Sequence, residues 1–340
     1  MRRSWFLPLL LVFVALVSAC GGTAPATPAA QQPASGGQAS GGKKYKIGFA
    51  NLTEDVVFTK LVRESIERKS KELGVDLVLA NNKLDGATAL ANAENFITQG
   101  VDGVVEFQTD EKFGNVIMSK FRAKNIPVIA IDIPMPGATF FGADNYKAGQ
   151  MAGEGLAKWV NEKWGGQVDY VLILDLPQSG PIPAARMQGQ LEGLQDNLKT
   201  KVPDDKILHL DSKNTQEEAR KVVGDTLPKI PAEAKHVVAI GINDGVILGT
   251  IAAFEAAGRR ADLKAVGQNA DPSGWPELCK AEPDNAYYGS TAYFPEKYGD
   301  KILPAMLDLL QQKPVPPSIY VDHVFVTRDN IKQYYADACK

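Results

Sequence analysis

Short apolar runs rich in β-branched residues alternate with longer amphipathic segments from residue 45 to the end of this chain. The runs have the length of strands and contain few polar positions, which is typical of strands that are covered on both faces. The segments between them repeat apolar side chains at three- and four-residue spacing, as helices with one buried face do. This alternation predicts an α/β fold built from doubly wound parallel sheets.

The alternation runs through the chain twice, which predicts two lobes. In the first pass we expect strands at 46–49, 75–80, 101–107 and 128–132 and helices at 58–73, 86–99 and 114–124. In the second pass we expect helices at 148–160, 185–198, 215–230 and 245–257 and strands at 168–176, 207–210, 236–242 and 263–267. Thr215 precedes Glu218 by three residues, a spacing typical of a helix N-terminus. A strand at 287–293, a helix at 296–312, a strand at 320–326 and a helix at 328–338 complete the pattern.

The N-terminus has the pattern of an export signal. Two arginines follow Met1, and residues 5–17 form an apolar run that is too short to span a bilayer. We therefore expect a signal peptide at residues 1–19. Residues 17–20, Val-Ser-Ala-Cys, resemble the lipobox of bacterial lipoproteins, and this resemblance implies lipid attachment at Cys20. The alternative is an ordinary secretory signal with an unrelated cysteine.

Residues 20–44 follow as a segment rich in Gly, Ala, Pro, Ser and Gln that contains nothing able to bury a core. We expect it to be a flexible linker. The remaining cysteines, Cys279 and Cys339, are exported if the signal is used, so a disulfide between them is permissible, but their spacing does not show that they meet.

Composition and motifs exclude several classes of function. The 37 basic residues balance the 40 acidic ones, so nothing favours a nucleic acid as partner. The three histidines lie far apart, which disfavours a histidine metal site, and we expect no cofactor. The sequence contains neither a G-x-S-x-G nor an H-E-x-x-H motif, so an enzyme is disfavoured.

Several segments resemble the type I periplasmic sugar-binding proteins, the relatives of ribose- and galactose-binding proteins. The segments that carry the resemblance are 58–63 with 71–74, 126–132, 142–145, 185–189, 242–244 and 267–269. The resemblance implies a first lobe of residues 45–143 plus 292–322 and a second of 144–291 plus 323–340. It further implies three crossovers between the lobes, near Asp144, Asn269 and Asp322-His323.

The resemblance also implies the function. We expect an extracytoplasmic substrate-binding lipoprotein of an ABC importer, a monomer that closes its two lobes on a monosaccharide or related polyol. Its partners are then the permease subunits and, through the lipid anchor, the membrane. Two alternatives stay open: a ligand-sensing lipoprotein for chemotaxis or signalling, and an exported glycosidase or esterase.

A sugar offers hydroxyls at its edge and C–H groups on its faces, so planar polar groups and aromatic rings suit it. The candidate ligand-binding residues are Asp55, Phe58, Asp132, Arg186, Asn243, Asn269 and Tyr293. The chain departs from the ribose binders in four places. Residues 54–59 hold one aromatic, Phe58, where they have an Asn and paired Phe. Ile133 stands where they have Arg, Asn269 where they have Asp, and Tyr293 where they have Gln.

Each candidate also has a purely structural interpretation. Asp132 could be a solvated residue at a strand end, Arg186 a surface helix residue, and Asn243 a helix cap. Phe58 could belong to the core. Glu54 and Asp55 could be read as a catalytic pair, although adjacent carboxylates in a loop are more typical of caps or solvated charge. Trp275 could line the cleft or pack inside the second lobe.

Overall fold

The computed structural model describes residues 43–108 and 110–340. The predicted signal peptide, Cys20 and nearly all of the predicted linker lie outside the described residues. Within residues 43–108 and 110–340, no helix combines the length and the apolar character needed to cross a bilayer.

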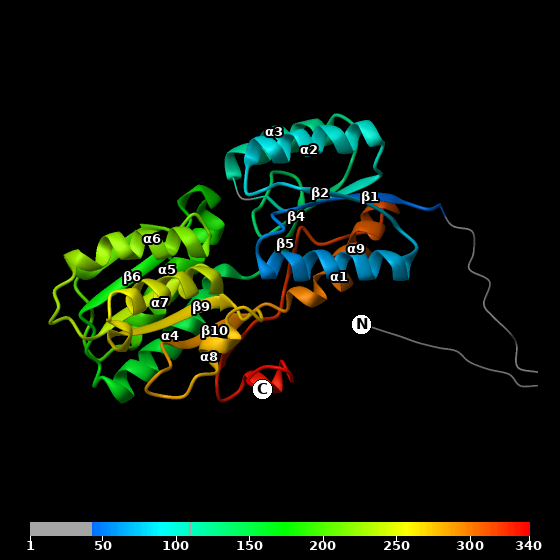
Figure 1. Ribbon diagram of the computed structural model, residues 1–340. Coiled ribbons are helices and arrows are strands. Elements are labelled where there is room, and N and C mark those ends of the chain that lie inside the picture. Colours follow the sequence, from blue (N-terminus) through cyan, green and yellow to red (C-terminus); the bar gives the residue numbers. More distant parts are fainter. Residues whose placement is uncertain (1–42, 109) are drawn as a thin grey trace, which may run out of the picture. The chain divides into compact units, whose positions relative to one another are not determined.

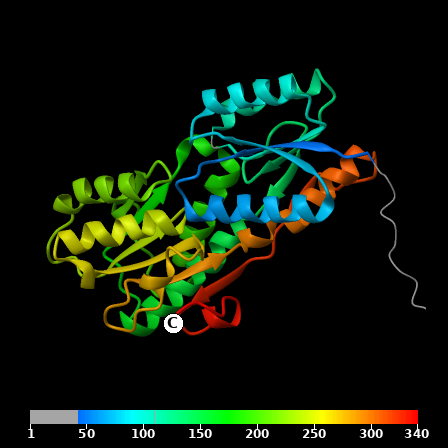
Figure 2. The ribbon, with the colours of Figure 1, turned by 45° about the vertical axis from the view of Figure 1, so that its right-hand side comes forward.

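The first lobe is built on a six-stranded parallel sheet with the order β11-β5-β4-β3-β1-β2. Its strands are β1 (Lys46–Asn51), β2 (Asp76–Asn81), β3 (Gly103–Glu106), β4 (Val128–Ile131), β5 (Thr139–Gly142) and β11 (Ser318–Tyr320). Its helices are α1 (Val57–Leu73), α2 (Gly86–Gln99), α3 (Glu111–Arg122) and α9 (Tyr298–Leu310). Every residue of β3 and β4 is buried, because α2 and α3 cover one face of the sheet and α1 and α9 the other (Figures 1 and 2).

The second lobe has a six-stranded sheet with the order β12-β10-β9-β8-β6-β7. Its strands are β6 (Tyr170–Asp175), β7 (Ile207–Asp211), β8 (Val237–Gly241), β9 (Leu263–Asn269), β10 (Tyr287–Ala292) and β12 (Val324–Thr327). Its helices are α4 (Asn145–Lys163), α5 (Pro181–Asn197), α6 (Gln216–Thr226), α7 (Asp244–Ala256) and the short α8 (Trp275–Leu278). All strand pairs are parallel except β10 with β12, which are antiparallel. The predicted fold class is therefore confirmed.

The chain passes between the two sheets three times. It leaves the first sheet after β5, returns after β10, and leaves again between β11 and β12. The first and third passages lie at Asp144 and Asp322-His323. The prediction of a passage near Asn269 is wrong, because Asn269 ends β9 inside the second sheet and the chain continues through β10.

Three element predictions also need correction. Strand β5 is missing from the predicted pattern. The expected strand at 320–326 is two strands, β11 and β12, in different sheets. The expected helix at 328–338 contains only a 3-10 turn at Ile331–Gln333, because the Asn330 side chain bonds the backbone of Phe325 and Thr327 and turns the chain there.

Helices α4 and α5 pack with their backbones unusually close together. A Cβ atom on Gly153 would lie 2.1 Å from the carbonyl oxygen of Gln190, and one on Gly189 would lie 2.2 Å from that of Tyr146. Only glycine permits this approach, since real Cβ contacts are far longer. The close packing fixes α5, and with it Arg186, against the start of α4.

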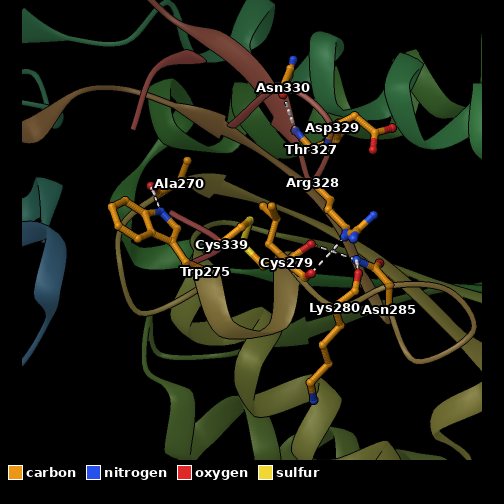
Figure 3. Close-up of a disulfide and its surroundings, with 11 residues drawn as sticks. Ala270, Trp275, Cys279, Lys280, Asn285, Thr327, Arg328, Asp329, Asn330 and Cys339 are labelled. Atoms are coloured by element: carbon orange, nitrogen blue, oxygen red, sulfur yellow. Dashed lines mark hydrogen bonds between the residues drawn. A yellow bond between two sulfur atoms is a disulfide. The ribbon is translucent and has the colours of Figure 1, made fainter. Parts of the chain in front are cut away.

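A disulfide joins Cys279 to Cys339, whose Cα atoms are 5.2 Å apart (Figure 3). Nearby, Nε of Arg328 donates to the carbonyl oxygen of Cys279 at 3.1 Å. The pairing that the sequence left open is thus present, and it ties the C-terminal segment to α8.

Candidate functional site

A pocket lies where the carboxyl ends of strands from both sheets come together. Its lining from the first lobe is Leu52, Val56, Phe58, Thr59, Phe107, Asp132 and Ile133. Its lining from the second lobe is Leu176, Ser179, Pro183, Arg186, Asn214, Ile242, Asn243 and Asn269. Ligands of open α/β sheets bind at this edge. Five of the seven predicted ligand-binding residues are among the lining side chains.

Asp132 follows β4 directly and is held in a left-handed backbone conformation, with φ +59°. Its backbone N–H donates to the carbonyl oxygen of Phe141 at 2.9 Å, which fixes this turn. The side-chain Oδ1 is buried and has no hydrogen-bond partner among the described residues. Burial raises the pKa of Asp132 to about 6, and the positive charge of Arg186 opposes this rise. Asp132 thus brings to the pocket lining a carboxyl group with hydrogen-bonding capacity that no described residue uses.

Arg186 lies in the first turns of α5 and is 7% exposed. Its Nε donates to Oδ1 of Asn145 at 2.9 Å, and its Nη1 donates to the carbonyl oxygen of Ile242 at 2.8 Å. The guanidinium carbon lies 5.1 Å from the centre of the Tyr293 ring. These contacts hold the side chain in one orientation, and its other N–H groups take no part in the two bonds. Asn145, which positions it, was not among the predicted site residues.

Asn243 has the structural role that the sequence allowed and also lies at the pocket. It caps α7, since its Oδ1 accepts from the N–H of Val246 at 2.9 Å, and it also lines the pocket. Its Nδ2 donates to Oδ1 of Asn214 at 2.7 Å. Asn214 is a lining residue that sequence reasoning missed. The available signal was its place between a predicted strand and the cap Thr215, where its φ of +62° suits asparagine.

Asn269 ends β9, is buried, and has a φ of +105°. It contributes the third asparagine of the pocket, from the strand next to β8. Asn214, Asn243 and Asn269 therefore follow or end three different strands of the second sheet, and their amides gather at one edge of it.

Phe58 is buried in α1 and lines the pocket. Its ring meets those of Tyr298 and Tyr293 edge-on, with centroids 5.7 Å and 6.5 Å apart. Tyr293 is 2% exposed and is not among the lining residues. Its hydroxyl donates to Oε1 of Gln268. The structure thus places Tyr293 behind the pocket, where its ring contacts both Phe58 and Arg186.

Asp55 is exposed and is also outside the pocket lining. The neighbouring Glu54 accepts from Nδ2 of Asn51 at 2.7 Å and from Nε of Arg63 at 2.9 Å. These contacts make Glu54 part of a surface ion pair at the start of α1, as the structural interpretation of the pair expected.

Trp275 packs inside the second lobe. Its Nε1 donates to the carbonyl oxygen of Ala270 at 3.0 Å (Figure 3), and its ring lies 5.3 Å from that of Tyr335. It is not among the lining residues of the pocket, so the packing interpretation describes it.

The pocket chemistry suits a neutral ligand with several hydroxyls. It combines one carboxylate, one guanidinium, three amides and two aromatic rings. Ligand hydroxyls can donate to the carboxylate and accept from the guanidinium and the amides. Among the described residues, no group of His, Cys, Asp and Glu is placed to hold a metal ion.

Two α/β lobes that share a pocket at the carboxyl ends of their strands define a two-lobed ligand-binding protein. The chain belongs to the periplasmic binding protein domain family, whose family model matches residues 47–314. It is therefore a binding protein and not an enzyme, and the glycosidase or esterase alternative is not supported.

This chain is also similar to individual sugar-binding proteins and to solved structures of binding proteins. The L-arabinose-binding periplasmic protein of Escherichia coli (strain K12) is 24% identical over 309 residues, which are 87% of this chain and 92% of that protein. An ABC transporter solute binding protein from Agrobacterium vitis with bound allitol has a TM-score of 0.76 at 20% identity, covering 86% of this chain and 99% of that one. The fructose binding periplasmic domain of a hybrid two-component system has a TM-score of 0.72 at 24% identity over 86% of this chain.

Proposed function

We propose that this protein binds a monosaccharide or related polyol between its lobes, as the substrate-binding lipoprotein of an ABC importer. The observation that supports this most directly is the meeting of Asp132 from one lobe and Arg186 from the other at a single pocket. The relatives named for L-arabinose and the structure with bound allitol support the same ligand class.

The pocket gives the ligand a role in closure. Asp132 offers an acceptor from the first lobe, while Arg186 and the three asparagines offer donors and acceptors from the second. A ligand that bonds both walls at once stabilises the closed arrangement over any open one, because only closure lets it make both sets of contacts. Closure is then the signal that the permease subunits recognise.

Cys20 is proposed as the lipid attachment site, which would hold the mature chain on the membrane through acyl chains. The support is the sequence of residues 17–20. Mass spectrometry of the protein from membranes is expected to find an acylated Cys20 as the first residue. An unmodified protein recovered from the culture medium would contradict the anchor.

A sensing lipoprotein is the second candidate. Its support is the likeness to the fructose binding domain of a hybrid two-component system, which uses this fold outside transport. Deletion of the protein in its own organism distinguishes the two, since an importer component is required for uptake of its ligand and a sensor is required for the response to it.

A thermal-shift panel of pentoses, hexoses and polyols tests the ligand class. A true ligand at a hundredfold excess over its Kd stabilises the protein by about 2.7 kcal/mol. Asp132→Asn and Arg186→Ala are expected to abolish that gain, whereas Arg220→Ala, an exposed arginine on α6, retains it. Retention of the full gain by both pocket variants would refute the site, and no gain with any compound of the panel would refute the ligand class.

A further inference from the structure

The two walls of the pocket differ in chemistry. From the first lobe come five apolar side chains, Leu52, Val56, Phe58, Phe107 and Ile133. Leu52, Phe107 and Ile133 are each 4–5% exposed, so they are anchored in the lobe and meet the pocket with only a small part of their surface. The second lobe supplies the guanidinium and the amides of the site, together with Ser179 and three apolar side chains, Leu176, Pro183 and Ile242.

Two polar side chains, Thr59 and Asp132, lie on the first-lobe wall. The hydroxyl of Thr59 lies 2.6 Å from the carbonyl oxygen of Thr53 and donates to it. Its hydrogen is thereby used within the lobe, and its methyl group adds to the apolar surface. Asp132 keeps an unpartnered Oδ1. Among the described lining side chains of this wall, Asp132 is therefore the single charged group, and the Thr59 hydroxyl can only accept.

This asymmetry is costly for a ligand with hydroxyls on every side. A hydroxyl pressed against Leu52, Phe107 and Ile133 loses its water and gains no partner, because hydrocarbon side chains neither donate nor accept. A methyl group at the same place buries apolar surface against them without that loss. Asp132 can meanwhile accept from the hydroxyls next to this end of the ligand.

We propose that the ligand is a sugar or polyol with a deoxygenated end, whose methyl group lies against the apolar wall formed by Leu52, Val56, Phe107 and Ile133. This inference rests on the proposed function and specifies its substrate class. The hydroxyls at the other end of the ligand face Arg186, Asn214, Asn243 and Asn269.

Matched pairs of sugars test the proposal by calorimetry on the mature chain. The pairs are D-galactose and D-fucose, L-galactose and L-fucose, L-mannose and L-rhamnose, and D-ribose and 5-deoxy-D-ribose. In the pair whose stereochemistry fits, the deoxy sugar is expected to bind about tenfold to a hundredfold more tightly, the range that one group in an apolar pocket discriminates. Equal or tighter binding of the hydroxylated partner would overturn this inference and leave the proposed function standing. If no sugar or polyol binds, the proposed function fails and the inference fails with it.

Variants of the wall test where the deoxy end lies. Ile133→Asn introduces a hydrogen-bonding group there and is expected to reduce the preference for the deoxy sugar at least tenfold, while Ile133→Leu keeps the preference. Val56→Thr is a second variant, at a half-buried position that tolerates a hydroxyl, and Val57→Thr is its control because Val57 is half-buried and outside the lining. The proposal is overturned if Ile133→Asn and Val56→Thr fold and both keep the wild-type ratio of affinities.

Discussion

Glu106 is a fully buried carboxyl group at the end of β3. Its Oε1 accepts from Nδ2 of Asn82 at 2.8 Å, and its Oε2 has no partner among the described residues. Burial raises the pKa of Glu106 from 4.5 to about 8, and the bond from Asn82 opposes this rise. The group is therefore protonated in the folded protein at neutral pH, whereas the unfolded chain carries it ionised.

This difference makes stability depend on pH. Between pH 4.5 and about 8 the folded protein binds one proton more than the unfolded chain at Glu106. The contribution of Glu106 to the free energy of unfolding therefore falls as the pH rises through this window, by about 1.4 kcal/mol per pH unit. Below pH 4.5 the protonated Glu106 makes its full contribution to the free energy of unfolding. By pH 8 about 5 kcal/mol of this contribution is lost.

Glu106→Gln tests the reasoning, because glutamine has the same shape and does not titrate. In urea unfolding at pH 5, 6, 7 and 8, the stability of the variant relative to wild type is expected to increase with pH, by several kcal/mol over the series. Glu64→Gln, at an exposed position on α1, serves as the control and should follow the wild-type profile. A stability difference between Glu106→Gln and wild type that stays constant across the series would refute the buried, protonated Glu106.

Three further predictions concern other residues. Because burial raises the pKa of Asp132 to about 6, ligand affinity is expected to be constant above pH 6 and to fall up to tenfold per unit below it, as calorimetry can show; affinity that rises in acid would contradict the role of the carboxylate. Replacing both Cys279 and Cys339 with Ser should lower the free energy of unfolding by about 4 kcal/mol, since the disulfide closes a loop over a separation of 60 residues; an unchanged urea midpoint would count against this. Gly153→Ala forces a Cβ to 2.1 Å from a backbone oxygen of α5 and should cost about 1–3 kcal/mol, whereas Gly224→Ala in α6 has open space and should be neutral or stabilising; equal melting temperatures for the two variants would refute the close packing.

Much of the fold could be predicted because strands of a doubly wound sheet differ so clearly from the helices between them. The failures occur where local pattern carries little information. Strand β5 has only four residues and follows a turn rich in proline and glycine, so no alternation develops. Strands β11 and β12 belong to different sheets, and a continuous apolar stretch cannot show that the chain changes sheet at Val321–His323.

In the site, too, some features could be predicted from local sequence pattern and others could not. Asp132, Asn243 and Asn269 could be predicted to lie at the ligand-binding edges of their sheets because each ends or follows a strand. That the two edges face each other came from the resemblance to two-lobed sugar-binding proteins. The partner Asn145 could not, because it reaches Arg186 only through the packing of separate elements. Asn214 was missed although it follows a predicted strand, because its bond with Asn243 joins two separate elements. Tyr293 is buried behind the lining residues Phe58 and Arg186. The type of residue and its place after a strand do not show whether a side chain lines the pocket or lies behind it.

The central claim is that one sugar or polyol bonds both lobes and draws them together. Small-angle X-ray scattering of the mature chain, with and without a ligand whose binding calorimetry has established, tests it most directly. We expect the radius of gyration to decrease on saturation, and to stay unchanged when the same ligand is added to Arg186→Ala. A ligand that binds tightly to the wild-type chain and leaves its scattering unaltered would contradict the claim.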